Sequence, residues 1–272
     1  MGKYSVLMSL YTKEKSDYLK QSIESMLNQT MMPDEIVIVK DGPLTAELED
    51  VLKKYTAMYP GLFNIIVSEK NIGLGLALNI GLKHCRNELV ARMDTDDISL
   101  PTRCEKQLKT FEEDNELIIL GSMVDEFYNN PNEVVSSRIV PTNHDKIYEF
   151  AKRRSPFNHP TVMYKKSKVL ERGGYSDLRR NQDVDLFARM LFAGAKAGNI
   201  NESLLLFRSN SDLSKRRRSW ENTKSYITTI HKLWRIGYSG FGDFLIVSIG
   251  QMVMFLCPLR VQNWLYKVFL RN

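Results

Sequence analysis

Residues 91–97 read Ala91-Arg92-Met93-Asp94-Thr95-Asp96-Asp97, with three carboxylates directly after the short apolar run Glu88-Leu89-Val90-Ala91. The apolar run predicts a buried strand. Carboxylates this close repel one another, and a divalent cation that prefers oxygen ligands, Mg²⁺ or Mn²⁺, would relieve the repulsion. In open α/β sheets, ligands bind beyond the carboxyl ends of strands, where these aspartates would lie. The alternative is a solvated acidic turn, with Asp97 or Ser99 as the N-cap of a helix that begins near Pro101.

Strand and helix patterns alternate through the first half of the chain. In residues 16–29, for example, Leu19, Ile23 and Met26 recur at helical spacing. Such an alternation predicts an α/β fold whose mostly parallel sheet is covered on both faces by helices. The expected strands are Tyr4–Ser9, Glu35–Val39, Phe63–Val67, Glu88–Ala91 and one starting at Ile118–Leu120, and the expected helices are Ser16–Gln29, Ala46–Met58, one running through Lys83, and Arg103–Glu113.

Beyond Asn115 the pattern loosens. Val134–Ile139 and Thr161–Tyr164 are expected to be strands, and Lys146–Ala151 and Asp183–Ala193 helices.

Composition fits an ordinary globular protein, because 43% of the 272 residues are hydrophobic and 26% are charged. This length fits one large α/β domain, or a catalytic domain with a C-terminal appendage. The three cysteines are scattered and odd in number, which indicates a reducing compartment rather than a disulfide framework. The N-terminus lacks the features of a signal peptide, so we expect a cytoplasmic protein.

The net charge of +6 is concentrated in the second half of the chain. Its basic groups are Arg153-Arg154, Arg179-Arg180 and Lys215-Arg216-Arg217-Arg218. An anionic membrane surface or a phosphorylated substrate would suit them. Nucleic acid is the least favoured partner, because no zinc finger or aromatic ribonucleoprotein motif is present.

Several motifs, taken together and in order, resemble glycosyltransferase family 2, the inverting nucleotide-sugar enzymes with the GT-A fold. The resemblance covers roughly residues 4–215, and no single motif would be sufficient. It rests on Ser25-Met26-Leu27-Asn28-Gln29-Thr30, Asp34 through Gly42, Asn71 through Gly81, Met93 through Asp97 (similar to the family's DxD signature) and Asn181-Gln182-Asp183-Val184-Asp185-Leu186. It implies a GT-A (Rossmann-like) sheet flanked by helices, with a helical C-terminal extension.

The resemblance also implies roles for the donor side. Asp96 matches the direct metal ligand, and Asp94 a contact to the ribose or to the metal through water. For Asp97 two roles stay open, one in the chemistry of the site and one as a helix N-cap. Asp41 matches the aspartate that recognises the nucleobase, with an ordinary turn residue as the alternative. The Asn71–Gly81 segment would let backbone approach the nucleotide at Gly73, and Asn71 is a nucleotide contact or an N-cap.

An inverting reaction needs a carboxylate to accept the proton of the attacking hydroxyl. Asp183 matches the family's catalytic base, with Gln182 beside it on the acceptor side and Asp185 pointing elsewhere. The alternative for Asp183 is a first-turn acid that stabilises the helix dipole. His159 resembles an acceptor-side residue, with a structural histidine as the alternative. Arg217, within Ser214–Trp220, resembles a basic loop over the diphosphate, and a solvated turn or a membrane-surface patch is the alternative.

The C-terminal tail is different in character. Phe244–Leu259 is nearly all apolar but shorter than the ~20 residues of a spanning helix. Residues 260–271 form a basic amphipathic pattern with aromatic residues. We expect the tail to lie on the cytoplasmic leaflet as a peripheral anchor, with packing against the catalytic domain as the alternative. The predicted division is a catalytic domain at 1–218, with a nucleotide-sugar half (1–115) and an acceptor half (116–218), followed by a membrane-associating tail at 219–272.

These features predict an inverting glycosyltransferase that uses Mn²⁺ or Mg²⁺. The expected donor is a nucleotide-sugar, a UDP-sugar first, carrying a hexose or N-acetylhexosamine. The expected acceptor is a hydroxyl of a polyprenyl-pyrophosphate-linked saccharide at the cytoplasmic membrane, in surface polysaccharide (O-antigen or capsule) synthesis. Two other classes stay open: a sugar-nucleotide nucleotidyltransferase, whose glycine-rich loop after the first strand is absent, and a non-catalytic sugar-binding protein at the membrane.

Overall fold

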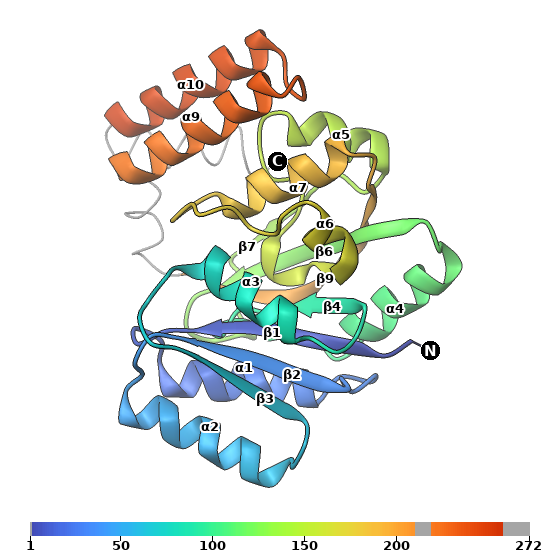
Figure 1. Cartoon of the computed structure of the whole chain (residues 1–272), viewed down its shortest axis with the longest axis vertical. Helices are drawn as coiled ribbons and strands as arrows, with labels where there is room; N and C mark the ends of the chain where they lie inside the picture. The colour runs from blue at the N-terminus through green and yellow to red at the C-terminus, as the bar shows by residue number, and fades with distance from the viewer. Residues whose placement is uncertain (1, 210–218, 258–272) are drawn as a thin grey trace.

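A computed structural model describes residues 2–209 and 219–257 of the chain. One sheet runs through the molecule in the order β3-β2-β1-β4-β8-β6-β9-β5, with β7 paired to β6 (Figure 1). The strands are β1 (Tyr4–Leu10), β2 (Glu35–Asp41), β3 (Phe63–Ser68), β4 (Leu89–Arg92), β5 (Ile98–Ser99), β6 (Leu117–Phe127), β7 (Ser136–Arg138), β8 (Met163–Lys165) and β9 (Lys196–Arg208).

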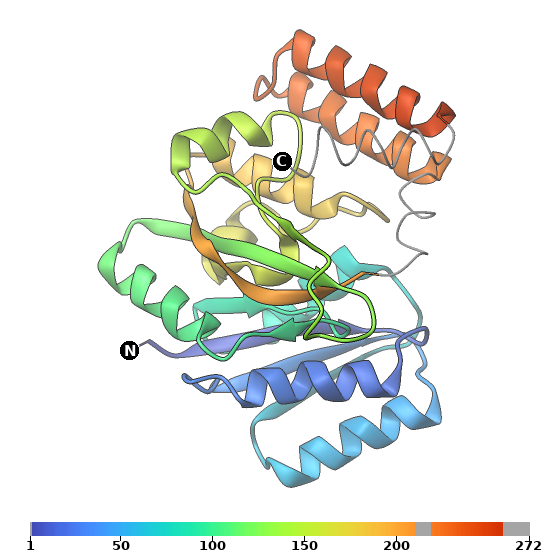
Figure 2. The same cartoon turned by 180° about the vertical axis from the view of Figure 1, so that it is seen from behind.

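Helices cover both faces of the sheet, as Figures 1 and 2 show from opposite sides. They are α1 (Ser16–Leu27), α2 (Ala46–Met58), α3 (Leu74–His84), α4 (Arg103–Glu113), α5 (His144–Ala151), α6 (Lys166–Glu171), α7 (Gln182–Phe192), α9 (Trp220–Arg235) and α10 (Phe241–Leu256), with a 3-10 turn at His159–Thr161. The sequence predicted α2 and α4 with these same bounds.

Two hydrophobic cores lie on the two faces of the sheet. Alternate residues of β1 enter different cores, Val6 and Met8 one core and Leu7 the other, because successive side chains of a strand point to opposite faces. The first core contains the apolar stripes of α1, α2 and α4, and the second those of α3, α5, α7 and α9. The predicted α/β class with a helix-flanked sheet is therefore confirmed.

The strands β3, β2, β1 and β4 are mutually parallel, so their carboxyl ends meet at one edge. In the second half β8 runs antiparallel to β4 and β6, while β9 runs parallel to β6. The sequence did not predict β9, whose pairing with β6 contains three register shifts. Such irregularities break the simple alternation on which strand prediction depends.

The helices α9 and α10 form a hairpin after β9. Ile230 and Leu233 of α9 are buried in the second core, whereas no residue of α10 is fully buried. Among the described residues, no helix is both long and apolar enough to cross a membrane. The predicted amphipathic segment at 260–271 lies outside the described residues, and the domain division stays a prediction.

Candidate active site

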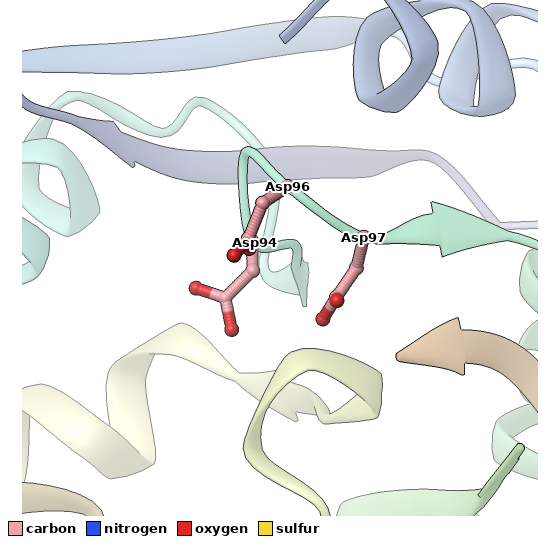
Figure 3. Close-up of side chains that lie close together, drawn as sticks. All are labelled: Asp94, Asp96 and Asp97. Carbon is pink, nitrogen blue, oxygen red and sulfur yellow. The ribbon is translucent and has the colours of Figure 1, made fainter. Parts of the chain in front are cut away.

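The three aspartates of the DxD-like motif lie on the loop between β4 and β5. One carboxylate oxygen from each of Asp94, Asp96 and Asp97 lies within 4.8 Å of the others. The side chains project from the same side of the loop (Figure 3). Asp94 and Asp96 are partly exposed and Asp97 is buried. Since β4 is parallel to β1 and β2, this acidic turn lies at the carboxyl edge of the sheet, as the sequence predicted.

Buried arginines neutralise part of this negative charge. Arg92, the last residue of β4, is fully buried and forms an ion pair with Asp94. The backbone N–H of Arg208 donates to Asp97 Oδ1 at 2.8 Å, and its Nε donates to the Asp96 carbonyl at 2.8 Å. Groups of the protein itself therefore offset part of the carboxylate repulsion, in addition to the cation that the sequence predicted.

Arg208 holds the acidic turn against the rest of the fold. Its guanidinium lies between two aromatic rings, 3.9 Å from the Tyr18 centroid and 4.5 Å from the Phe127 centroid. It also donates to Gln21 Oε1 at 2.6 Å. Because Arg208 ends the unpredicted strand β9, the sequence had indicated no role for it.

Glu14 adds a fourth carboxylate, from the loop between β1 and α1. Its Oε2 accepts a hydrogen bond from the Thr95 hydroxyl at 2.9 Å. Burial, together with the charges of Asp94 and Glu14, raises the pKa of Asp96 to about 7. Burial likewise raises the pKa of Asp97, with Asp96 and Asp94 adding to the effect.

These residues fit a hard divalent cation. Asp97 Oδ2 is buried and has no hydrogen-bond partner among the described residues. A buried acceptor without a partner is costly, and a metal ion beside it would remove that cost. Carboxylates whose pKa is raised by burial, and further by their mutual repulsion, are groups that a nearby cation would stabilise in the ionised form.

The helix-cap alternative for this turn is wrong. The helix after the turn, α4, begins at Arg103, and its N-cap residue is Thr102. Ser99 lies in β5, where its backbone N–H donates to Ser25 Oγ at 3.0 Å. Neither Asp97 nor Ser99 caps the helix.

Asp41, at the end of β2, organises the turn before α3. Its carboxylate accepts hydrogen bonds from Asn71 Nδ2 at 2.9 Å, Ile72 N at 2.7 Å and Gly73 N at 3.1 Å. Gly73 has φ +94°, a conformation that strongly favours glycine, and Gly73 rather than Asn71 is the N-cap position of α3. Three predicted donor-side residues, Asp41, Asn71 and Gly73, are thus brought together.

Arg179 connects this turn to the segment that precedes α7. Its Nη1 donates to Asn71 Oδ1 at 3.1 Å and lies 3.0 Å from the position of a Cβ on Gly73. Gly75 lacks a side chain where the packing leaves little room, since a Cβ there would lie 3.1 Å from the Gln182 side chain. The backbone of α3 at Gly75 therefore lies close to the start of α7.

Asp183 and Asp185 stand in the first turn of α7 but have different surroundings. Asp185 is buried and pairs with Arg189 at 2.7 Å, and Arg189 Nη2 donates to the Gly174 carbonyl at 2.8 Å. Asp183 is partly exposed, and desolvation raises its pKa, while the charge of Arg92 opposes this rise and that of Asp94 adds to it. Asp185 has a structural partner, which leaves Asp183 as the candidate base.

Two acceptor-side predictions concern His159 and Gln182. His159 Nε2 lies 2.9 Å from the Tyr175 hydroxyl, and its ring packs on Phe187. Burial, with the charge of Arg92, holds the pKa of His159 well below its usual value, so the ring is neutral. Gln182 is buried against α3. These contacts are typical of residues that stabilise the fold. The remaining predicted site residue, Arg217, lies outside the described residues.

The comparisons with known proteins agree with this fold. Residues 5–178 match Glycosyl transferase family 2. An uncharacterised glycosyltransferase of Haemophilus influenzae is 39% identical over 270 residues, 99% of this chain and 100% of that protein. The amylovoran biosynthesis glycosyltransferase AmsE of Erwinia amylovora is 36% identical over 264 residues, 97% of this chain and 98% of AmsE.

A third relative is the UDP-Gal:alpha-D-GlcNAc-diphosphoundecaprenol beta-1,3-galactosyltransferase of Escherichia coli. It is 34% identical over 270 residues, 99% of this chain and 97% of the relative. Among solved structures, the mannosyltransferase PcManGT of Pyrobaculum calidifontis, in complex with GDP-Man and Mn²⁺, has a TM-score of 0.66 at 14% identity, over 96% of this chain and 72% of that chain.

The structure of S. aureus TarS 1-349 with UDP has a TM-score of 0.64 at 16% identity, covering 98% of this chain and 76% of TarS 1-349. At these identities the structural likeness shows the fold alone. The family match and the full-length relatives confirm the predicted enzyme class, a glycosyltransferase rather than a nucleotidyltransferase or a non-catalytic binding protein. The chain belongs to glycosyltransferase family 2.

Proposed function

We propose that the protein is a metal-dependent, inverting glycosyltransferase of surface polysaccharide synthesis. It transfers a hexose or N-acetylhexosamine from a UDP-sugar to a hydroxyl of a saccharide carried on polyprenyl pyrophosphate. The E. coli relative, named for a UDP-galactose donor and a diphosphoundecaprenol-linked acceptor, supports both substrate classes. AmsE, named for amylovoran biosynthesis, supports the polysaccharide context.

The observation that carries this proposal is the acidic turn at the carboxyl edge of the sheet, with carboxylate oxygens within 4.8 Å of one another. Asp96 would ligate Mn²⁺ or Mg²⁺, and Asp94, which is held by Arg92, would contact the ribose or a metal-bound water. When bound, the ion stabilises negative charge on the departing diphosphate. Asp41, with Asn71 and Gly73, holds the turn that faces the nucleotide, and Arg217 contributes positive charge toward the diphosphate.

On the acceptor side, Asp183 takes the proton of the attacking hydroxyl. Its raised pKa suits a base, because a carboxylate with a higher pKa has a greater affinity for the proton. His159 and Gln182 support the acceptor side from the 3-10 turn and from α7. We further propose that residues 1–218 carry the reaction and that the tail places the enzyme peripherally on the cytoplasmic membrane, where the lipid-linked acceptor would be.

A screen of nucleotide-sugars by thermal shift, with and without Mn²⁺, tests the donor and the metal together. A ligand present at about 100 times its Kd stabilises the folded state by roughly 2.7 kcal/mol. We expect UDP-sugars to raise the melting temperature only with Mn²⁺, and more than GDP-sugars do.

The same thermal-shift measurement on the Asp96→Asn variant tests whether Asp96 ligates the metal. Because burial, together with the charges of Asp94 and Glu14, raises the pKa of Asp96, the substitution should stabilise the metal-free protein while removing its response to Mn²⁺. If Asp96→Asn keeps the Mn²⁺-dependent shift and the turnover of the wild type, the assignment of Asp96 as metal ligand is wrong.

A further inference from the structure

The outer face of α10 consists of apolar side chains and glycines. Its exposed positions follow a helical spacing, so that they form one continuous stripe along the helix. The exposed large side chains of this stripe are Phe241, Leu245, Ile246, Ile249, Met252, Val253 and Leu256. The three polar residues of α10, Asp243, Ser248 and Gln251, lie off this stripe.

The inner side of α10 already has its partner. Phe244 stacks on Trp234 of α9 at 5.5 Å between ring centroids, and Phe255 packs on Trp220. The opposite side of α9 packs on the catalytic fold through Ile230 and Leu233. Figures 1 and 2 both show α10 as the outermost layer, at the end of the molecule opposite α2. The apolar stripe therefore faces away from the rest of the described chain.

A group of cations surrounds the turn where α9 meets α10, and we call it the basic rim. Lys232 and Arg235 lie in the last turn of α9. Arg153, beyond α5, pairs with Asp243 of α10 at 2.6 Å, which brings its neighbours Lys152 and Arg154 to the same turn. Glu149 pairs with Lys152 at 2.6 Å. Five cations against these two carboxylates leave the rim positively charged.

We propose that the outer face of α10 and the basic rim together dock on an anionic lipid bilayer, with α10 lying in the membrane interface. An apolar face next to cations matches acyl chains next to anionic headgroups. A helix of 16 residues is about 24 Å long, shorter than the hydrocarbon core, so it lies along the interface rather than across it. In a symmetric dimer a second copy of this chain would place the same positively charged rim beside the stripe, which favours an anionic bilayer as the occupant.

This inference rests on the proposed function, since it names the surface by which the tail would reach the membrane that carries the lipid-linked acceptor. The test is flotation of the full chain with vesicles of equimolar phosphatidylethanolamine and phosphatidylglycerol, and with vesicles of phosphatidylcholine. We expect the wild type to bind the anionic vesicles. The Ile246→Glu/Ile249→Glu variant should bind them about tenfold more weakly or worse, because carboxylates are unfavourable among acyl chains. Lys232→Glu/Arg235→Glu should reduce binding to the anionic vesicles and leave binding to the phosphatidylcholine vesicles unchanged.

The matched control is Met58→Glu/Val67→Glu, which makes the same chemical change on α2 and β3 at positions exposed to 56% and 65%, similar to 55% and 59% at Ile246 and Ile249. The control should bind vesicles as the wild type does. The inference is overturned if the wild type binds neither kind of vesicle, or if the Ile246→Glu/Ile249→Glu variant binds the anionic vesicles as well as the control does. It is also overturned if light scattering finds a dimer that Ile246→Glu/Ile249→Glu dissociates without any vesicle binding.

A separate measurement keeps the two proposals apart. Transfer to a water-soluble saccharide acceptor should be equal in the wild type and in Ile246→Glu/Ile249→Glu. If the vesicle results are as expected but the wild type shows no UDP-sugar turnover, the proposed function is wrong, while the proposal that α10 and the basic rim bind an anionic bilayer is retained.

Discussion

Asp183 and Asp185 lie in the same helical turn, but their different surroundings give them different roles. Asp185 is buried with Arg189, whose other N–H groups donate to backbone carbonyls of the turn before α7, Gly174 among them. That pair stabilises the fold and leaves Asp185 little capacity for chemistry. Asp183 keeps part of its side chain accessible, within the electrostatic influence of Arg92 and Asp94. A proton acceptor needs this accessibility, so the two residues should respond differently to the same substitution.

We expect Asp183→Asn to lower transfer by about a thousandfold, since general bases contribute roughly 10²–10⁴-fold to a rate, and to leave donor binding unchanged. Asp185→Asn breaks a buried ion pair and should cost roughly 3 kcal/mol of unfolding free energy with a nearly normal turnover at low temperature. Turnover, nucleotide affinity by calorimetry and urea unfolding separate the two. A stable Asp185→Asn protein without transfer activity would instead make Asp185 the base.

The pH dependence follows from the same residue. A base acts in its ionised form, and a raised pKa means that Asp183 becomes protonated at a higher pH than an exposed aspartate as the solution is acidified. At saturating Mn²⁺ and donor, kcat should therefore fall on the acid side with a midpoint above 3.8. His159, whose pKa is lowered by burial, stays neutral and adds no second step near neutrality. A kcat independent of pH down to that value would contradict the assignment.

Arg208 is a residue whose importance depends on distant partners. Arg208→Met should remove its hydrogen bonds to the Asp96 carbonyl and Gln21 and loosen the acidic turn, so Mn²⁺ affinity should fall by about tenfold, as for other groups that orient metal ligands. High Mn²⁺ should restore kcat. The control is Arg138→Met, because Arg138 also stacks on an aromatic ring, Phe207 at 4.0 Å, but pairs with Glu126 instead.

Calorimetric titration with Mn²⁺ alone provides the readout. Arg138→Met should lose stability and keep its Mn²⁺ affinity. Equal Mn²⁺ affinities in Arg208→Met and the wild type would mean that Arg208 has no role in positioning the turn.

At the scale of elements, α3 illustrates how closely a helix can approach the sheet. A Cβ on Gly81 would lie 2.7 Å from Val39 Cγ2 and would also collide with Leu7 Cδ1. The missing side chain lets α3 pack directly on β1 and β2, which positions the turn that binds Asp41. Helix propensity alone would favour alanine there, so tertiary packing opposes the local preference.

Gly81→Ala should accordingly cost about 1–3 kcal/mol of unfolding free energy by overpacking. Gly250→Ala makes the same change in α10, where no described residue outside the helix's own backbone lies within 4 Å of the added Cβ, and should stabilise the protein by roughly 0.5–1 kcal/mol. Urea unfolding of both variants measures the difference. If Gly81→Ala is as stable as Gly250→Ala, the close packing of α3 on the sheet is not as described.

At the scale of the whole molecule, the hairpin is attached in two unequal steps. The buried residues Ile230, Leu233 and Tyr238 belong to the second core, and Tyr238 donates through its hydroxyl to the Tyr148 carbonyl at 2.8 Å. All three precede Phe241, where α10 starts. The catalytic fold therefore depends on α9 and the following turn much more than on α10.

A chain ending at residue 240 should fold, keep UDP-sugar hydrolysis and lose membrane sedimentation. A chain ending at residue 219 should lose about 5 kcal/mol or more, because it also lacks the burial of Ile230, Leu233 and Tyr238. Circular dichroism melting and hydrolysis assays compare the two. If the chain ending at 240 is as unstable as the shorter one, α10 is part of the folding core rather than a surface element.

The sequence by itself determined the α/β class, the first four strands with their helices, and the acidic turn after β4. These features depend on hydrophobic periodicity and on residues that are neighbours in the chain, so they can be read locally. Only the tertiary structure decided the surroundings of that turn. Arg208 bonds to Asp97, 111 positions away, and Thr95 to Glu14, 81 positions away. No local pattern encodes such contacts, because the sheet order that brings β9 and the β1–α1 loop to β4 emerges only when the whole chain packs.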